Sequence, residues 1–397
     1  MRILFCNYEY PPLGGGGGVI NALLAAEMAK RHEVTVLTSR GNGLPSLTVE
    51  SGVRVIRVPV FFRRREAVAN VPSMLAFIPV AIREGKKLLA AERFDVINTH
   101  FVLPTGPVGN ALAHFSGVPN VLTVHGGDLY DPSKFISPHR HLLLRLWIRH
   151  LLRNCAAVVG QSRNTLHNMR RYYAPELEGI RIPLGIRRPI IDAVPRKRYG
   201  FRPGQILLVT VGRLVPRKAV GQLVALMNAL DDPAVHLLII GTGPQEGALK
   251  SEVAARRLQA RVHFLGHVDE AEKFRLLAIS DVYVSTSQHE GFGLVFLEAM
   301  ACGLPVVCYD CGGQTDFLRD GQTGYLVPLN DQARFTDRCR SLIASSPARA
   351  VMGENNGRRV QDFFIDRCAA RYESTFADLL EAKANAVRPR LAVSGTA

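Results

Sequence analysis

Two glutamates stand eight positions apart in the run EGFGLVFLEAMACGLPVV, which extends from Glu290 to Val307. Glycines follow the first of them, so we expect Glu290 to end a loop and Glu298 to lie on the next helix. A carboxylate accepts hydrogen bonds from hydroxyl groups, and free amides at a helix N-terminus bind a phosphate or a further hydroxyl. Two carboxylates at this spacing can therefore bind two hydroxyl-bearing parts of one ligand, which points to a nucleotide-sugar.

A pair of cationic residues follows another strand-like run, ILLVTV. The segment from Val211 to Ala219 reads VGRLVPRKA, and Arg213 and Lys218 would project from it into one cleft. A diphosphate leaving group gains negative charge as its bond to the sugar breaks, and a guanidinium and an ammonium can stabilise that charge. The alternative is that both charges are simply solvated.

A histidine ends a strand-like run in the first half of the chain. It lies in the segment VLTVHGGDLY, from Val121 to Tyr130. Because small residues follow His125, we expect its side chain to face a cleft and not the core. Asp128 either binds an acceptor or caps the next helix. His100 ends another such run and has similar geometry.

Five glycines, Gly14–Gly18, lie between the first predicted strand and the first predicted helix. Open α/β sheets bind ligands at this place. The dinucleotide fingerprint G-x-G-x-x-G would need a third glycine where this chain has Val19, Ile20 or Asn21, which disfavours a NAD site. The alternative to a ligand-binding loop is a flexible turn.

The order of the elements predicts an α/β protein of two doubly wound domains with parallel sheets. A border rich in Pro, Gly and Arg lies at Gly179–Pro195. We expect an N-terminal domain over 1–185, a second domain over 186–365, and a C-terminal helix over about 366–384. Residues 385–397 are typical of a disordered tail. The strands that we expect in the second half are at Ile206–Val211, His236–Ile240, Val262–Phe264, Asp281–Ser285 and Pro305–Cys308.

These motifs together resemble the retaining glycosyltransferases of the GT-B fold, in the large family 4 that contains sucrose synthases and phosphatidylinositol mannosyltransferases. The resemblance covers residues 1–380. It implies two Rossmann-like domains that face each other across a cleft, with the C-terminal helix crossing back onto the first domain. It also implies transfer of a hexose-type sugar from a UDP- or GDP-linked donor to an acceptor hydroxyl, with retention at the anomeric carbon.

The resemblance assigns roles to residues along this cleft. Arg213 and Lys218 would hold the diphosphate, and Glu298 would bind the ribose hydroxyls. Glu290 would hold the sugar, and His125 would act beside the reacting centre. Backbone groups would complete the donor site: Gly15 and Gly16 near the phosphates, the turn at Gly243 below the donor, Val268 beside the base, and the amides of Gly291, Phe292, Gly293 and Leu294 around the sugar.

The chain departs from the family pattern at three positions. Ala219 follows the lysine where the family usually has Gly, Asp316 replaces a Glu, and Leu184 replaces an Asn. The last change puts one polar contact between the domains in doubt. The chain has no Asp-x-Asp metal motif, and the resemblance implies a metal-independent reaction that needs no cofactor besides the nucleotide-sugar.

The net charge of +15 is unevenly distributed. Residues 1–185 hold 22 Lys and Arg against 12 Asp and Glu, a surplus of 10, whereas the rest holds 27 against 22, a surplus of 5. The surplus suggests an anionic partner for the first half. No nucleic-acid-binding motif accompanies it, so nucleic acid is not expected.

A basic and apolar helix is predicted over Pro138–Arg153 (PHRHLLLRLWIRHLLR), and FFRRR at 61–65 adds a second cluster. The helix suits the surface of an anionic bilayer, or it is an ordinary helix with a solvated basic face. A glycan or lipid-linked acceptor, in cell-surface polysaccharide or glycolipid synthesis, follows by analogy. The stripe of basic residues consists of His141, Arg145, Arg149 and Arg153.

The composition, 47% hydrophobic and 21% charged over 397 residues, is typical of a soluble protein of two domains. The N-terminal run MRILFCNYEYPP lacks the apolar core of a signal peptide. We therefore expect a cytoplasmic protein, either free or peripheral on the inner face of the cell membrane. Cys308 and Cys311 form a single pair without nearby His ligands, so a zinc site is not expected.

Two alternatives from other classes remain. One is a nucleotide-sugar epimerase or hydrolase on the same architecture. The other is a non-catalytic, membrane-associated protein that binds nucleotide-sugars. The intact set of Arg213, Lys218, Glu290 and Glu298 argues against loss of activity.

Overall fold

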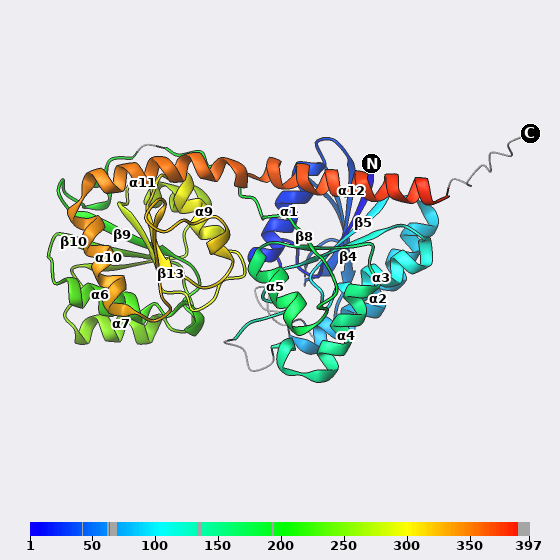
Figure 1. Cartoon of the computed structure of the whole chain (residues 1–397), viewed down its shortest axis with the longest axis horizontal. Helices are drawn as coiled ribbons and strands as arrows, with labels where there is room; N and C mark the ends of the chain where they lie inside the picture. The colour runs from blue at the N-terminus through cyan, green and yellow to red at the C-terminus, as the bar shows by residue number, and fades with distance from the viewer. Residues whose placement is uncertain (42, 62, 64–69, 133–136, 193, 388–397) are drawn as a thin grey trace, which may run out of the picture.

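The computed structural model of the protein describes residues 1–41, 43–61, 63, 70–132, 137–192 and 194–387. They form two α/β domains, each a twisted sheet covered by helices, and the last helices run along one side of both domains (Figure 1). The predicted fold class is confirmed. Along the described residues, no helix combines the length and the apolar composition that crossing a bilayer requires.

The first domain has an eight-stranded sheet in the order β3-β4-β2-β1-β5-β6-β7-β8. Neighbouring strands are parallel, except that β3 pairs antiparallel with β4 at one edge. The strands are β1 (Arg2–Cys6), β2 (Glu33–Arg40), β3 (Leu47–Glu50), β4 (Val53–Pro59), β5 (Val96–His100), β6 (Asn120–Val124), β7 (Ala157–Gly160) and β8 (Ile180–Arg181). The helices are α1 (Gly16–Met28), α2 (Val71–Ala91), α3 (Gly106–Ser116), α4 (Leu142–Arg153) and α5 (Arg163–Tyr172), with a 3-10 turn η1 at Pro138–Arg140.

The second domain has a six-stranded, all-parallel sheet in the order β11-β10-β9-β12-β13-β14. The strands are β9 (Ile206–Val211), β10 (Val235–Ile240), β11 (Val262–Gly266), β12 (Val282–Ser285), β13 (Val306–Tyr309) and β14 (Gly324–Val327). The helices are α6 (Gly221–Leu230), α7 (Glu246–Ala255), α8 (Glu270–Ala278), α9 (Leu294–Ala301), α10 (Gln332–Ala344) and α11 (Ser346–Arg359). The 3-10 turns are η2 (Arg196–Tyr199), η3 (Pro216–Lys218), η4 (Gly313–Asp316) and η5 (Val360–Phe363).

Helices cover both faces of each sheet, so the central strands are apolar throughout and do not alternate. Every residue of β10 (VHLLII) is buried, and β6 and β12 are also buried at every position. The edge strand β3 differs, because its residues alternate between exposed and half-buried. All strands of a parallel sheet end at one edge, so the loops that follow them gather there and form the two sides of the cleft.

The C-terminal helix α12 (Ile365–Val387) crosses back onto the first domain and packs there, as expected. Its buried side chains Tyr372 and Phe376 join the core of the first sheet with Ile3 and Phe5. Beside this crossing, the linker residue Ile186 pairs with Phe364. The Ile186 amide donates to Phe363 O at 3.0 Å, and the Ile365 amide donates to Ile186 O at 2.8 Å.

The C-terminal helix expected over about 366–384 lies within α12, and a break in the helical chain precedes it. The chain leaves α11, turns through η5, and becomes extended at Phe364. Its pairing with Ile186 requires this extended backbone, and local propensity does not contain that information. The helix α12 also continues to Val387, so residues 385–387 of the predicted tail are helical; the rest of that tail lies outside the described residues.

Candidate active site

Three glycines mark the carboxyl edge of the second sheet, at the ends of β9, β10 and β11. The Gly212 amide donates to Ile240 O at 2.9 Å, and the Gly241 amide donates to Gly266 O at 2.7 Å. A Cβ on Gly241 would lie 2.1 Å from Gly212 O, and φ of Gly241 is +131°. Only glycine fits this close approach, which packs the ends of β9 and β10 tightly together at this edge.

The Lys218 ammonium and the Glu290 carboxylate form an ion pair at this edge, with Lys218 Nζ on Glu290 Oε1. Arg217 Nη1 lies 3.4 Å from Glu290 Oε2, and the Ser287 hydroxyl donates to Glu290 Oε1 at 2.7 Å. Glu290 is only 7% exposed. The structure thus brings together two residues that are 72 positions apart.

Glu290 is ionised at neutral pH. Burial opposes ionisation, but the charges of Lys218 and Arg217, with hydrogen bonds from Lys218 and Ser287, outweigh it and lower the pKa of Glu290. Both carboxylate oxygens are engaged by these partners. The carboxylate therefore fixes the two cations in the cleft at least as much as it offers itself to a ligand.

The loop that carries Glu290 is held by its backbone. The Gly313 amide donates to Glu290 O at 2.8 Å, and a Cβ on Gly313 would lie 2.1 Å from Gly291 O. The amides of Gly291, Phe292 and Gly293 donate to no other group within the described residues. Because α9 begins immediately afterwards, these amides are free for ligand oxygens, as the sequence suggests.

The two domains touch at this loop. The Ser162 hydroxyl donates to Gly291 O at 3.1 Å, and a Cβ on Gly126 would lie 3.0 Å from Gly291 Cα. Asp316 is buried and accepts from Arg181 Nη1 at 3.2 Å across the domain boundary. Leu184, which stands where an Asn was expected, joins the apolar core of the second domain instead, so an apolar contact takes the place of the polar one.

Glu298 lies on α9 and faces α8. Its Oε1 accepts from Lys273 Nζ at 2.7 Å, whereas its Oε2 is buried and has no partner within the described residues. Burial raises the pKa of Glu298, although the Lys273 charge opposes this. An acceptor atom without a partner in a buried place is the feature that a ribose hydroxyl would satisfy.

Arg213 differs from Lys218 in its surroundings. Its side chain is exposed, and it makes no ion pair or side-chain hydrogen bond within the described residues. The Lys218 side chain instead packs on Gly212, whose added Cβ would lie 3.3 Å from Lys218 Cε. Arg213 and Lys218 both line a small pocket beside β9. The guanidinium is therefore near the ammonium and available to a ligand.

His125 lies at the opposite side of the cleft, in the loop after β6. Its Nε2 is 3.0 Å from His100 Nδ1, and its ring stacks on Phe101 with centroids 4.3 Å apart. Burial lowers the pKa of His125 to about 4, against a smaller rise from a hydrogen bond with Gln161. The imidazole is therefore neutral at physiological pH.

Asp128 supports the His125 loop. Its Oδ1 accepts from the His125 amide at 2.9 Å and its Oδ2 accepts from the Val102 amide at 2.8 Å. The helix-capping alternative is wrong, because the residues directly after Asp128 form turns and no helix starts there. The bonds to two separate loops explain the aspartate at this position.

The glycine loop after β1 has two kinds of position. A Cβ on Gly15 or Gly16 would meet nothing within 4 Å, whereas one on Gly17 would lie 2.2 Å from Phe101 Cζ. Gly17 is thus required for packing, whereas Gly15 and Gly16 leave open space at the start of α1. A Cβ on Gly243 would lie 2.3 Å from Leu214 O, so this glycine too has a packing reason.

A cavity of about 370 Å³ lies between these groups. Of the predicted site residues, those that line it are Gly16, His125, Lys218, Glu290, Gly291, Phe292, Gly293 and Leu294. Those that do not line it are Gly15, Asp128, Arg213, Gly243, Val268 and Glu298, and their contact with a ligand stays a prediction.

Sequence reasoning missed several lining residues. These are Phe101, Asp131, Gln161, Arg217 and His289. Arg217 and His289 each stand directly before a predicted catalytic residue, so adjacency was the available signal. Gln161 has no such signal, because only the pairing of β6 with β7 brings it beside His125.

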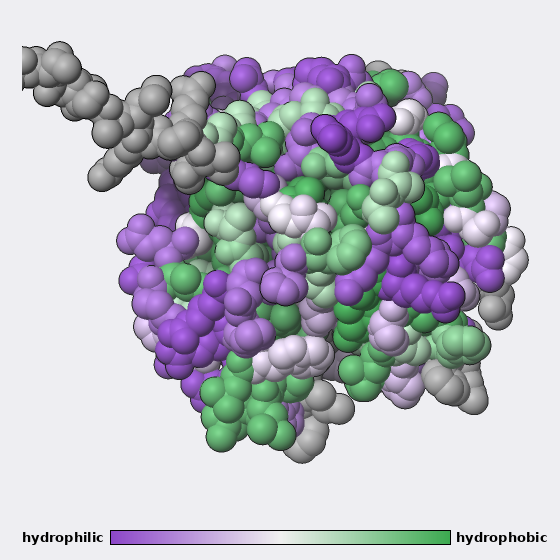
Figure 2. All heavy atoms as spheres, turned by 90° about the vertical axis from the view of Figure 1, so that its right-hand side faces the viewer, coloured by the Kyte–Doolittle hydropathy of each residue, from purple (hydrophilic) through white to green (hydrophobic). Residues whose placement is uncertain are grey.

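The basic helix differs from its prediction. Arg153 Nη2 pairs with Glu176 Oε1 at 2.6 Å, Arg149 Nη2 lies 3.8 Å from Glu176 Oε2, and Arg145 donates to a backbone carbonyl. The basic stripe is therefore largely satisfied by the protein itself. The first two turns of α4 instead expose leucines (Leu142, Leu143 and Leu146), and apolar side chains gather at the lower end of the face shown in Figure 2. The second basic cluster at 61–65 lies mostly outside the described residues.

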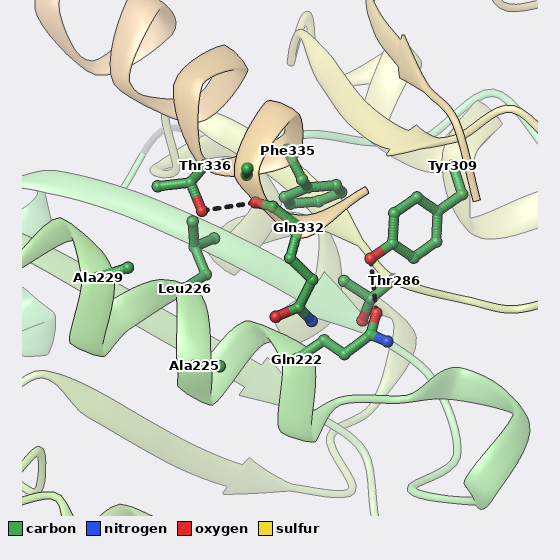
Figure 3. Close-up of a pocket in the computed structure, with 10 residues that line it drawn as sticks. Gln222, Ala225, Leu226, Ala229, Thr286, Tyr309, Gln332, Phe335 and Thr336 are labelled. Atoms are coloured by element: carbon green, nitrogen blue, oxygen red, sulfur yellow. Dashed lines mark hydrogen bonds between the residues drawn. The ribbon is translucent and has the colours of Figure 1, made fainter. Parts of the chain in front are cut away.

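A second cavity, of about 230 Å³, lies between α6 and α10, away from the cleft (Figure 3). Its polar groups bond one another, since Tyr309 OH donates to Gln222 Oε1 at 2.6 Å. At its edge, the Thr286 hydroxyl bonds the carbonyl oxygens of Lys218 and Ala219 at 3.2 and 3.0 Å. This cavity thus borders the back of the loop that carries Lys218.

Two parallel-sheet domains with a cleft between their carboxyl edges, and a last helix that crosses back, define the GT-B class of glycosyltransferases. The chain belongs to glycosyltransferase family 4: the family model "Glycosyltransferase Family 4" matches residues 14–187, and "Glycosyl transferases group 1" matches residues 194–359.

Known proteins agree with this assignment over nearly the whole chain. A glycogen synthase of Mycobacterium tuberculosis is 31% identical over 374 residues, covering 88% of this chain and 87% of the relative. Among solved structures, sucrose-phosphate synthase from Thermosynechococcus elongatus has a TM-score of 0.83 at 23% identity, covering 96% of this chain and all of that one. Anabaena HepE, solved in complex with UDP-glucose, has a TM-score of 0.74 at 20% identity, covering 95% of this chain and all of that one.

Proposed function

We propose that the protein transfers a hexose from a UDP- or GDP-linked donor to a hydroxyl group of a glycan or lipid-linked acceptor, with retention at the anomeric carbon. The observation that carries the proposal is the cationic cluster at the carboxyl edge of the second sheet. Lys218 and Arg217 are held there by buried Glu290, and Arg213, which has no ion pair among the described residues, shares a small pocket with Lys218. Positive charge at this place stabilises a departing nucleoside diphosphate.

The remaining donor contacts follow from the surrounding groups. The unpartnered Oε2 of Glu298 would accept a ribose hydroxyl, and the free amides of Gly291 and Phe292 would bind the sugar. Backbone atoms near Val268 would contact the base. The binding of UDP-glucose by HepE supports a donor of this kind.

A thermal-shift panel tests the donor class. Wild type and Glu298→Ala would be heated with UDP, GDP, ADP or NAD, because a ligand that binds the folded state raises the melting temperature. We expect a rise with UDP or GDP that the variant loses. No rise with any nucleoside diphosphate, or a rise with NAD alone, would overturn the proposal.

The proposed reaction uses no metal and no cofactor besides the donor, because Lys218 and Arg213 already supply the charge that the leaving group needs. Retention would follow from attack on the face that the leaving group vacates. Proton NMR of the first-formed product would report the anomer directly. An inverted anomer, or a rate that EDTA abolishes and Mg²⁺ restores, would contradict these two parts.

An epimerase or a hydrolase on this architecture remains the second candidate. Product analysis with the nucleotide-sugar alone separates the candidates: rapid release of an isomerised or free sugar without acceptor would favour the second, and a requirement for acceptor would favour transfer. Vesicle binding with no transfer to any acceptor would favour a non-catalytic binding protein.

We further propose that the protein is cytoplasmic and docks on an anionic membrane surface through the start of α4. Leu143 is 80% exposed and Leu142 is 66% exposed, beside exposed Arg140 in a chain of net charge +15. An apolar tip flanked by cations suits a bilayer with anionic lipids, and such a surface would hold a lipid-linked acceptor.

Flotation with vesicles tests the surface. We expect wild type to bind vesicles that contain phosphatidylglycerol and to bind pure phosphatidylcholine weakly, and Leu143→Asp to bind neither. The matched control is Val351→Asp on α11, since Val351 is also exposed, at 59%, but lies on the second domain. Equal binding by both variants would overturn the assignment to α4.

A further inference from the structure

A line of three polar side chains runs from the core of the first domain to the cleft. Asn98 Nδ2 is 3.1 Å from His100 Nε2, and His100 Nδ1 is 3.0 Å from His125 Nε2. Asn98 and His100 are fully buried, and His125 is 8% exposed. The outermost member alone lines the cavity.

The hydrogen-bond donor at the inner end of the line, the amide of Asn98, sets the direction of every hydrogen bond along it. The amide nitrogen of Asn98 can only donate, so His100 Nε2 must accept. A neutral His100 then has its proton on Nδ1, which donates to Nε2 of His125. A neutral His125 that accepts at Nε2 has its own proton on Nδ1.

The unpaired atoms favour this orientation of Asn98. Its Oδ1 has no partner within the described residues. The opposite orientation would turn Oδ1 to His100 and leave both amide hydrogens unpaired, and buried donors without partners are rarer than such acceptors. Both imidazoles remain neutral, because burial lowers the pKa of His125 to about 4 and burial with the neighbouring His125 lowers that of His100 well below its ordinary value.

Packing fixes the ring of His100. Phe5 stacks on one side of it with centroids 5.7 Å apart at 11°, and Tyr372 of the returning helix α12 lies 6.1 Å away. The Tyr372 hydroxyl is itself bonded to Thr123 at 2.9 Å. The crossing of α12 therefore closes the core around His100 and keeps its two nitrogens directed at their partners.

We propose that Asn98 and His100 fix the tautomer of His125, so that His125 presents an Nδ1–H donor, and not a basic lone pair, for ligand oxygens. This rests on the proposed sugar transfer: an oxygen of the donor sugar or of the attacking hydroxyl would accept from Nδ1–H in place of Gln161, which bonds His125 and lines the same cavity. His100 is thus a positioning residue that acts through His125. A neutral imidazole that donates a hydrogen bond stabilises charge without itself taking up a proton.

Nitrogen-15 NMR of the full-length protein tests the tautomer without any assay of activity. Histidine would be labelled, and the signals of His125 would be identified by their loss in His125→Gln. We expect the Nδ1–H form in wild type. His100→Asn retains an amide donor near the former Nδ1 and should retain that form, whereas His100→Leu removes the donor and should shift His125 towards Nε2–H. An Nε2–H form in wild type, or an unchanged tautomer in His100→Leu, would overturn the proposal.

Sugar transfer provides the second readout. We expect His100→Leu to lower kcat by about ten- to a hundredfold with the KM for the donor little changed, and His100→Asn to restore most of it. Equal losses in both variants would show a merely structural role. A wild-type protein with the Nδ1–H form but no transferase activity would leave the tautomer assignment standing and overturn the proposed function, so the two failures are distinguishable.

Discussion

The two sides of the cleft are built from different chemistry. The second domain contributes charge: Lys218 and Arg217 surround the carboxylate of Glu290, and Glu298 pairs with Lys273. Among the described residues, the first domain contributes mainly uncharged groups to the cavity, such as buried His125 and the open Gly16 at the start of α1, with Asp131 as its one carboxylate. Charge is concentrated where a diphosphate would leave, and uncharged hydrogen-bonding groups lie where a sugar would react. A test of this contrast changes one side and leaves the other intact.

The largest effect is expected from the charged side. Lys218→Met removes the half-buried ammonium and should lower kcat by about a thousandfold, because the leaving group loses its nearest fixed charge. The measurement is steady-state transfer with a UDP- or GDP-sugar, on protein whose fold is checked by circular dichroism, since Glu290 is left without its main partner.

Arg256→Met, directly after the end of α7, is the control for charge alone. Its ion pair with Glu252 lies on the surface, with Arg256 39% exposed, and we expect wild-type turnover. If Lys218→Met turns over at the wild-type rate, the charged side does not act on the leaving group, and the contrast between the two sides loses its meaning.

The next effect concerns donor binding. Glu298→Ala should weaken binding of the nucleoside diphosphate by about 30-fold, because a hydrogen bond to a charged group contributes about 2 kcal/mol. Calorimetric titration measures it. A 2′,3′-dideoxy nucleotide should bind wild type and variant equally, since it lacks the hydroxyls that Glu298 would bind. A variant that still prefers the ribose form would place the ribose elsewhere.

The neutral side is tested by stability. The pKa of His125 is lowered to about 4, so the unfolded chain binds the extra proton first as pH falls below about 6.5. Stability is therefore full above that value and declines towards pH 4, by about 2 kcal/mol between pH 7 and pH 5 from this residue. Urea unfolding at pH 7 and pH 5 measures this loss of stability. The loss in His125→Gln should be smaller than that of wild type by about the same amount. An equal loss in both proteins would mean that His125 is not buried neutral.

The interior strands of both sheets and the edge strand β11 were predictable, whereas the other three edge strands were not. The apolar run ILLVTV, expected as a strand at Ile206–Val211, matches β9. The predictions missed β3, β8 and β14. The first is only half-buried and the second has two residues, and each exists because a neighbouring strand supplies its hydrogen bonds. Strand pairing is tertiary information, which a local pattern lacks.

The same distinction applies to the site. Motifs placed Lys218 and Glu290 in one cleft, but their direct pairing depends on the approach of β9 and β12. Lys273 is the partner of Glu298, although no motif surrounds it. Asp128 was expected to bind an acceptor or cap a helix; it caps no helix and joins two loops, and its contact with an acceptor stays a prediction. Roles that depend on long-range contacts required the structure.

The smallest effect is expected from Thr286, which lies behind the loop that carries Lys218 on the charged side of the cleft. The Thr286 hydroxyl bonds the carbonyl oxygens of Lys218 and Ala219, and Ala219 has a φ of +46°, which is strained for a residue other than glycine. Thr286→Val keeps the shape and removes these bonds, so we expect kcat to fall about five- to tenfold, equivalent to about 1 kcal/mol, with donor affinity nearly unchanged.

Thr336→Val is the matched control, because Thr336 lines the same cavity (Figure 3) but bonds only within α10. If both variants lose the same activity, the cavity wall matters only for stability. If Thr286→Val alone loses activity, then the position of Lys218, and not only its charge, distinguishes this side of the cleft from the other.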